Sequence, residues 1–178
     1  GANHKRETIA FPKRHQCVIE RAAVHLAWCN FSKGFTENHD PTTAATLLLE
    51  IGDDEAAEAK LLADPGRIHG DNYGALVPLA QALKARQRLR GETAIYRALL
   101  TAILNRAYAR AYGHAARYWA RMREIAATGI GLLPLESHEY FEAAIRSRHA
   151  RKVAFWAYVN GRRRDIADED GDEPNDDA

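Results

Sequence analysis

The chain has 178 residues, of which 46% are hydrophobic and 28% are charged, and its formal net charge is +1. This composition is close to that of an ordinary globular domain, so it excludes wholesale disorder, a collagen-like fibre and a small disulfide scaffold. No apolar run reaches the roughly 18 residues that a membrane span requires, and the basic start of the chain lacks the apolar core of a signal peptide. Two cysteines supply no disulfide framework, so we expect a cytoplasmic protein that does not enter a membrane.

The apolar residues recur every three or four positions through most of the chain, which is the spacing of amphipathic helices. One stripe runs through residues 108–126 and contains Trp119 and Met122, and a second is formed by Leu76, Leu79, Ala80 and Leu83. Alanine and arginine, which both favour helices, are abundant, whereas few segments alternate as strands do. We therefore predict an all-α protein of seven or eight helices.

Prolines, glycines and acidic residues divide the first half of the chain. Pro41 favours a helix start and Gly52 a helix end, and the acidic residues 53–55 suit the first turn of the next helix. Pro78 would kink the following helix unless that helix begins at Val77. The predicted segments are a basic arm at 1–15 and helices at 16–30, 41–52, 53–64 and 71–86.

In the second half, Gly91 precedes a helix that is expected to begin near Glu92. Continued to residue 127 it would be roughly 54 Å long at 1.5 Å per residue, so we predict a break between Tyr108 and Tyr112 and two helices that fold back as an antiparallel pair. Residues 129–134 interrupt the helical pattern again. Two further helices are predicted, one opened by Ser137 and one spanning residues 151–158.

Several helices joined by short loops indicate stacked antiparallel hairpins, as in α-solenoid or tetratricopeptide-like proteins. The alternative is an irregular helical bundle. We expect one helical domain at residues 16–164, followed at 165–178 by a disordered tail that holds eight acidic residues and no basic one.

Positive charge is concentrated in residues 86–164, which hold 16 Lys or Arg against 5 Asp or Glu. If one helical face is presented there, four arginines fall on a narrow stripe with an aromatic neighbour, and arginine forks suit phosphate groups. The competing interpretation is a solvated surface whose charge the acidic segments offset. The candidate binding residues are Arg106, Arg110, Arg117, Tyr118, Arg121, Arg151 and Lys152.

Metal and catalytic chemistry find little support in the pattern. Cys17 and Cys29 would lie about 18 Å apart along one helix, too far to share a zinc ion. No nucleophile elbow, Walker-type loop or dinucleotide fingerprint is present. A catalytic role would require a pocket that gathers His69 or His114 with arginines, and His114, among alanines, is interpreted as a packed residue. We therefore expect no enzyme, no metal and no cofactor.

Three blocks occur in an order and spacing that resemble a known family. They are Tyr96–Leu100, Tyr112–Tyr118, and His149–Lys152 with Phe155 and Trp156. Together they are similar to the C-terminal part of an uncharacterised bacterial family of α-helical proteins, some of whose members carry a SWIM-type zinc finger. The likeness covers roughly Leu61 to Val159 and implies helical architecture without a reaction. Two cysteines cannot supply the ligands of that finger, so its role is not carried over.

Aromatic residues in these blocks are expected to pack between the last hairpins and to bury a large apolar area. The set is Tyr112, Tyr118, Trp119, Phe155 and Trp156. Packing between helices accounts for these aromatic residues without a chemical role. The sequence therefore favours a helical scaffold that binds another protein, or its own copy, through a groove between hairpins. The alternative is a nucleic-acid-binding module that uses the basic face of residues 86–164 and is modulated by the acidic tail.

Overall fold

The structure is a computed structural model and describes residues 40–161. Within this range it contains α-helices, two short 3-10 helices and no strand, which confirms the all-α prediction for these residues. The predicted arm at 1–15, the predicted helix at 16–30 and the acidic tail at 165–178 lie outside the described residues. The elements are α2 (Pro41–Glu50), α3 (Asp54–Ala63), η1 (Pro65–Arg67), α4 (Tyr73–Ala85), α5 (Leu89–Asn105), η2 (Ala109–Ala111), α6 (Tyr112–Ala127), α7 (His138–His149) and α8 (Val153–Val159).

Three helix starts follow from capping residues that the sequence shows. Asp40 and Asp53 each accept a hydrogen bond from the main-chain N–H three residues further on, at the starts of α2 and α3. Ser137 does the same at the start of α7, over 3.2 Å. Each cap satisfies one of the N–H groups that a helix leaves unpaired at its first turn. The predicted starts near Pro41, residues 53–55 and Ser137 are therefore confirmed.

Pro78 lies in the interior of helix α4 and does not mark its start. The helix begins at Tyr73 and not at Val77, so Pro78 lies inside it. Pro78 is exposed, and the carbonyl that a proline leaves without a helical partner can be hydrated on that side.

Helix α5 begins at Leu89, three residues before the predicted start near Glu92. The reason is a carboxylate from another helix. Glu58 of α3, which is buried, accepts hydrogen bonds from the main-chain N–H groups of Arg90 and Gly91 at 3.1 and 3.0 Å. This remote cap stabilises a first turn that receives no hydrogen bond from the side chain of its own N-cap residue, Arg88.

The predicted break between α5 and α6 is confirmed. Helix α5 ends at Asn105, and Ala107 has a φ of 55°, in the left-handed region that ends helices. After η2 the chain enters α6 at Tyr112.

The two helices on either side of this break run antiparallel against each other. Glu92, in the first turn of α5, forms an ion pair with Arg121 of α6. One turn further along α5, the ring of Tyr96 stacks on Tyr118, with centroids 5.0 Å apart. Residue numbers increase along α5 while the numbers of their partners in α6 decrease, as they do in an antiparallel helical hairpin.

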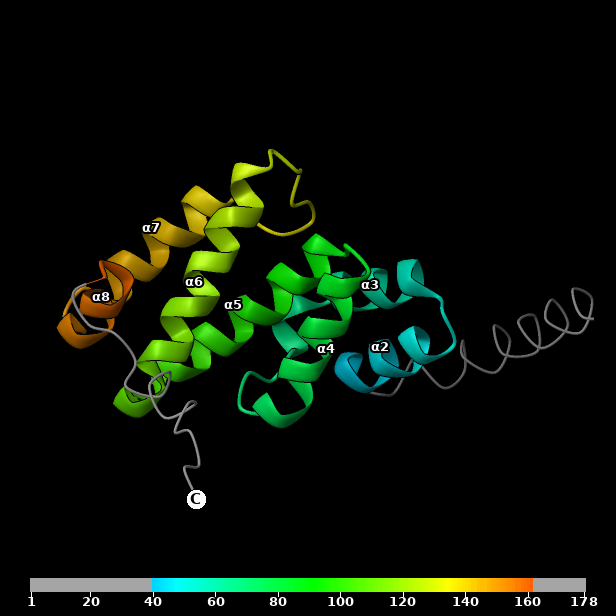
Figure 1. Cartoon of the computed structure of the whole chain (residues 1–178), viewed down its shortest axis with the longest axis horizontal. Helices are drawn as coiled ribbons and strands as arrows, with labels where there is room; N and C mark the ends of the chain where they lie inside the picture. Colours follow the sequence, from blue (N-terminus) through cyan, green and yellow to red (C-terminus); the bar gives the residue numbers. More distant parts are fainter. Residues whose placement is uncertain (1–39, 162–178) are drawn as a thin grey trace, which may run out of the picture. The chain divides into compact units, whose positions relative to one another are not determined.

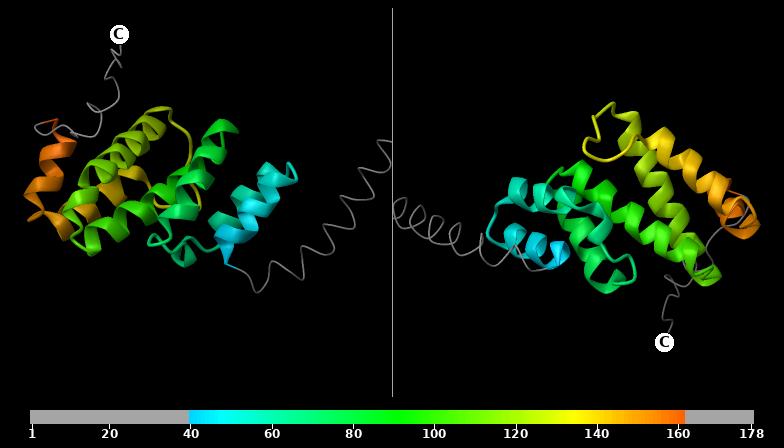
Figure 2. Two further views of the ribbon diagram at one scale, coloured as in Figure 1. Left: turned by 60° about the horizontal axis from the view of Figure 1, so that its bottom comes forward. Right: turned by 180° about the vertical axis from the view of Figure 1, so that it is seen from behind.

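Helices that follow one another in the chain also pack together, as α2 does with α3, α4 with α5, and α5 with α6. Contacts of α3 with α5 and of α6 with α8 join these pairs into one core. Figures 1 and 2 show the described helices progressing from α2 and α3 at one end to α7 and α8 at the other. This order agrees with stacked hairpins, while a solenoid or tetratricopeptide-like repeat stays a prediction.

The far end of the core is aromatic, as predicted. Trp119 and Phe155 are fully buried and meet edge to face at 6.2 Å. Trp156 lies edge-on to Trp119 at 5.5 Å, and Tyr112 meets Phe155 at 6.0 Å. Edge-to-face contacts of this kind add to the free energy of burial.

Candidate functional site

A cavity of about 610 Å³ lies between α5, the loop that follows η1, and the segment that leads into α7. Its floor is one face of α5, formed by residues at positions 94, 97, 98, 101, 102 and 105, which is the spacing of a single helical side. Small residues dominate this face, so the helix leaves space there. The opposite walls include His69, Gly70, Pro134, Glu136 and Phe141. We call this space the Arg97 cavity.

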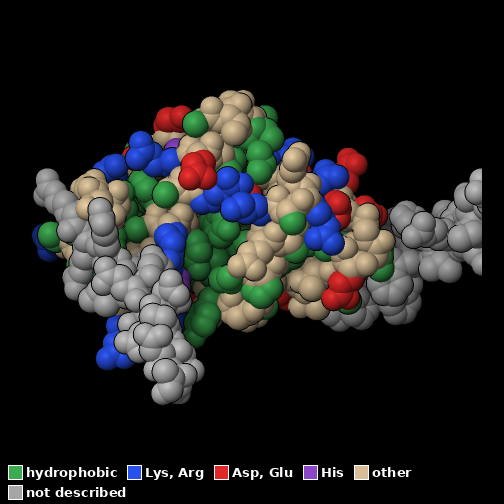
Figure 3. Space-filling model, in the orientation of Figure 1, with side chains coloured by type: hydrophobic (Ala, Val, Ile, Leu, Met, Phe, Trp, Pro, Cys, Tyr) green, Lys and Arg blue, Asp and Glu red, His purple; other side chains and the backbone are tan. Residues whose placement is uncertain are grey.

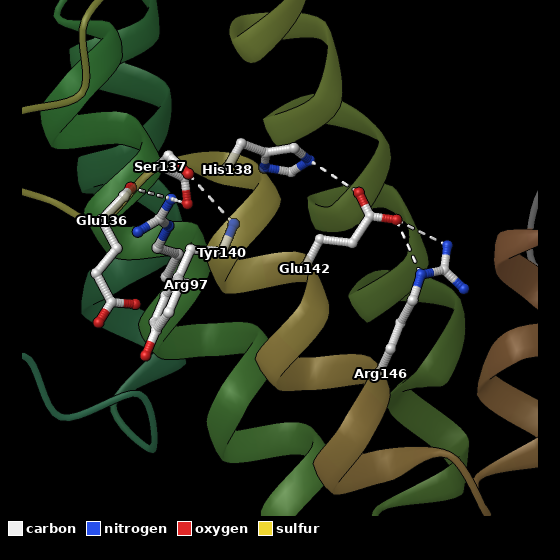
Figure 4. A network of polar contacts seen from close by, with 7 residues as sticks. All are labelled: Arg97, Glu136, Ser137, His138, Tyr140, Glu142 and Arg146. Atoms are coloured by element: carbon white, nitrogen blue, oxygen red, sulfur yellow. Dashed lines mark hydrogen bonds and ion pairs between the residues drawn. The ribbon is translucent and has the colours of Figure 1, made fainter.

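Arg97 is the charged residue buried in this wall, with 9% of its surface exposed. Its Nη2 donates to the main-chain oxygens of Glu136 and Ser137 at 2.9 and 3.4 Å. The guanidinium carbon lies 4.5 Å from the centre of the Phe141 ring, a cation–π contact. Figure 4 shows the guanidinium meeting the Glu136 main-chain oxygen while the Glu136 carboxylate extends away from it.

The electrostatic state of Arg97 reflects its burial. Desolvation lowers the pKa of the guanidinium, and the negative charge of Glu136 opposes this effect. The Nε atom is buried and has no hydrogen-bond partner among the described residues. Arg97 therefore stays a cation that the surrounding protein satisfies only in part.

Gly70 sets how closely the loop after η1 approaches α5. A Cβ at this position would overlap the main-chain oxygen of Ala98 and would lie 2.8 Å from the Cβ of Ala102. Only a residue without a side chain can therefore bring the loop against the helix backbone. This contact forms one edge of the Arg97 cavity.

A second polar chain runs along α7 beside the cavity. His138 lies with its Nε2 3.6 Å from a carboxylate oxygen of Glu142, and Arg146 binds the other oxygen at 2.8 Å (Figure 4). Burial lowers the pKa of His138, and the Glu142 carboxylate acts in the opposite direction.

Two further concavities continue from the Arg97 cavity. One of about 300 Å³ shares Thr101, Glu136 and Phe141 with it and extends to Arg148. Another of about 620 Å³ begins at Arg148 and is lined by Arg151 and Lys152. Because neighbouring cavities share lining residues, they adjoin one another along α5 and α7, and we call the three together the α5–α7 groove.

The charges in the α5–α7 groove are mainly positive. Three cations line one end of the groove, and we name them the cationic corner: Arg148, Arg151 and Lys152. None of them has an ion pair with any residue between 40 and 161. Burial lowers the pKa of His149, and the positive charges of Lys152 and Arg148 lower it further. Of the two carboxylates in the lining, Asp71 pairs with Arg106 at 2.9 Å, whereas Glu136 has no ion pair with a described residue, so four cations stand against one unpaired carboxylate. The groove therefore attracts negative charge.

Two of the predicted binding residues, Arg151 and Lys152, lie in this groove. The others are not part of its lining. Arg106 pairs with Asp71, Arg110 lies in η2, and Arg117 contacts Nδ1 of His114 at 3.0 Å. His114 is exposed, so its interpretation as a packed residue is wrong.

The arginine stripe does not form as a single helical face. The break after Asn105 places Arg106 and Arg110 outside the helix that carries Arg117 and Arg121. Arg121 binds Glu92 through Nε and Nη2 at 2.8 and 3.2 Å, which raises the Arg121 pKa. Tyr118 uses one ring face to stack on Tyr96. On the face that Figure 3 presents, Lys and Arg side chains are interspersed with Asp and Glu.

Sequence analysis missed Arg97, Glu136 and Phe141 as site residues. Arg97 occurs in a block that was singled out for its likeness to a family, and it lies on the same helical side as several small residues, which is the signal that could have found it. His69, considered as a loop residue, does line the Arg97 cavity. His114 does not.

The described part of the chain bears on two further questions, whether side chains gather as metal ligands and whether a helix could span a membrane. Between residues 40 and 161 no three His, Cys, Asp or Glu side chains gather as metal ligands would. No helix in the same range is long and apolar enough to span a membrane. Cys17 and Cys29, weighed above as zinc ligands, lie outside this range.

Fold and site together define an all-helical protein with a cation-lined groove. The chain matches the family of unknown function DUF6880 over residues 31–158, and it belongs to this family. The matched segment includes every residue of the α5–α7 groove. No curated protein and no solved structure is significantly similar to the chain.

Proposed function

We propose that this protein is an interaction scaffold that holds an acidic segment of a partner protein in the α5–α7 groove. The observation that carries the proposal is the charge distribution along the groove. Its middle is mixed, with Phe141, Ala144 and Ile145 beside the polar Thr101 and Glu136. Its two ends are cationic, with Arg97 at one and the cationic corner at the other. An extended or helical segment with apolar and acidic side chains complements such a surface.

We propose binding and not catalysis as the activity of the groove. The buried cation Arg97 in its wall stays protonated and cannot act as a general base, and no carboxylate of the described residues lines the groove beside the buried His149. From the sequence features given above, we also propose that the protein is cytoplasmic and that it is related to bacterial proteins with a SWIM-type finger.

The groove is tested by blocking its middle. Ala144 is exposed and lines the groove, whereas its neighbour Ala143 is exposed and does not. Dodecapeptides selected from a display library on the full chain are expected to be acidic. We expect Ala144→Trp to weaken their binding at least tenfold in fluorescence anisotropy, and Ala143→Trp to leave it within twofold. Failure to enrich any peptide, or equal effects of the two variants, contradicts the proposal. Concentration-dependent dimers that Ala144→Trp abolishes would reassign the groove to a second copy of the chain.

A second candidate function is nucleic-acid binding, and the cationic corner is the observation that favours it. Arg148 and Arg151 are exposed and Lys152 is half-buried, and none of the three pairs with a described carboxylate, as is common for phosphate-binding side chains. The acidic residues 165–178 would then compete with phosphate for the same cations.

We expect labelled single-stranded DNA to bind the full chain at 50 mM salt, with affinity that falls steeply as salt rises. Arg148→Ala with Arg151→Ala should reduce the steepness of log affinity against log salt by about 1.4, since each lost phosphate contact removes roughly 0.7 on single strands. Arg123→Ala, an exposed change on α6, is the control. Deletion of 165–178 should tighten binding, and absence of binding at 50 mM salt contradicts this function.

A further inference from the structure

Among the described residues, Arg97 differs from the other buried residues that carry a full charge. Glu58 and Glu92 are also buried, and each has an arginine partner, Arg90 and Arg121 respectively. Arg97 has main-chain oxygens and an aromatic ring in place of a carboxylate. Burying a charge without an opposite charge is costly, so natural proteins usually pair it.

The surroundings of Arg97 leave room for the missing partner. Arg97 is part of the wall of a cavity of about 610 Å³. Its Nε is buried without an acceptor among the described residues, whereas Nη1, for which no hydrogen bond is found either, keeps accessible surface. The nearest acidic side chain in the wall, Glu136, turns its carboxylate away (Figure 4). Thr101 and Asn105 add a hydroxyl and an amide on the same side of α5, and both can donate to an anion.

The cavity also strengthens an ion pair formed within it. Phe141 covers one face of the guanidinium, and Ala94 and Ala98 line the floor. These apolar groups lower the dielectric constant beside the guanidinium, so a charge-assisted hydrogen bond counts for more there than on a fully exposed surface.

We propose that the Arg97 cavity is a carboxylate receptor, in which a carboxylate of the partner segment accepts hydrogen bonds from the guanidinium N–H groups that Glu136 and Ser137 leave free. This inference rests on the proposed function and names the group that the groove recognises. The carboxylate can come from an Asp or Glu side chain or from the C-terminus of the partner. A purely structural Arg97 would instead only tether the segment before α7.

The test follows the Arg97 Nε–H resonance of the full-length, ¹⁵N-labelled chain while three hexapeptides of Ala and Gly are added. The first has blocked ends and one central Glu. The second has Gln in that place and a free C-terminal carboxylate, and the third has Gln and blocked ends. The resonance is assigned by its absence in Arg97→Lys.

We expect at least one carboxylate peptide to shift this resonance in a saturable way and the neutral peptide to leave it in place. The first two peptides distinguish a side-chain carboxylate from a C-terminal one. A shift of equal size with the neutral peptide, or no shift with any of the three, overturns the proposal. Because the natural chain is titrated, the result does not depend on how well a variant folds.

Affinity supplies a second readout. For the carboxylate peptide that binds, Arg97→Met should weaken binding at least tenfold, and Arg123→Met should change it less than twofold. Equal effects of the two variants contradict the receptor. If display peptides bind in a manner sensitive to Ala144→Trp but the resonance never responds, the groove stands and only this inference fails. If no display peptide is enriched while the resonance responds, the carboxylate site stands without the scaffold function.

Discussion

Replacing Glu92 by leucine is expected to lower the free energy of unfolding by about 1–3 kcal/mol. Glu92 is fully buried at the start of α5 and receives two hydrogen bonds from Arg121, so its removal leaves a guanidinium in the interface without its main partner. Equilibrium denaturation in urea measures the change. A loss below about 1 kcal/mol would contradict a strong dependence of the hairpin on this pair.

Two variants separate the lost pair from lost packing. Glu124→Gln removes the exposed carboxylate that also contacts Arg121, and it should cost less than about 1 kcal/mol because surface ion pairs contribute little. The double change Glu92→Leu with Arg121→Met removes both charges. It should recover most of the stability, since apolar residues of similar size often replace a buried ion pair without cost.

Gly70→Ala is expected to destabilise the protein by about 3 kcal/mol, at the upper end of the usual cost of overpacking. The new methyl group would overlap the main-chain oxygen of Ala98, and a helix backbone cannot yield as a flexible side chain can. The loop must then move away from α5, so binding in the Arg97 cavity should weaken as well. Thermal unfolding and the peptide titration measure the two effects.

The matched control is Gly74→Ala. No atom lies within 4 Å of the position that its Cβ would occupy, and Gly74 lies within α4. Alanine should therefore stabilise the helix by about 0.5–1 kcal/mol. If Gly70→Ala were as harmless as Gly74→Ala, the close approach of the loop to α5 would not be a feature of the folded protein.

Local signals were sufficient to predict most helix boundaries. Asp40, Asp53 and Ser137 are caps that act within three residues, so the sequence alone shows them. The break between α5 and α6 could be predicted from length, although the residue that adopts the left-handed conformation is Ala107. Alanine has no preference for that conformation, so packing of α6 on α5 must determine the site of the turn.

Contacts between distant residues could not be predicted in the same way. Arg121 was assigned to an exposed stripe because its partner, Glu92, lies 29 residues earlier in the chain. Helical periodicity gives the direction of a side chain but not the residue that lies opposite. The same limit explains why Arg97 was overlooked, since its surroundings come from α5, the loop near His69 and the segment before α7.

The cap that Glu58 provides makes the start of α5 dependent on a segment some thirty positions away. The turn that it stabilises leads directly into the part of α5 that forms the floor of the groove. A shortened chain that began at η1 would keep every groove residue, yet its α5 would lose the acceptor for Arg90 and Gly91 and fray at its beginning. The groove and α3 thus belong to one folding unit, and truncation experiments must keep α3 to retain the cap of α5.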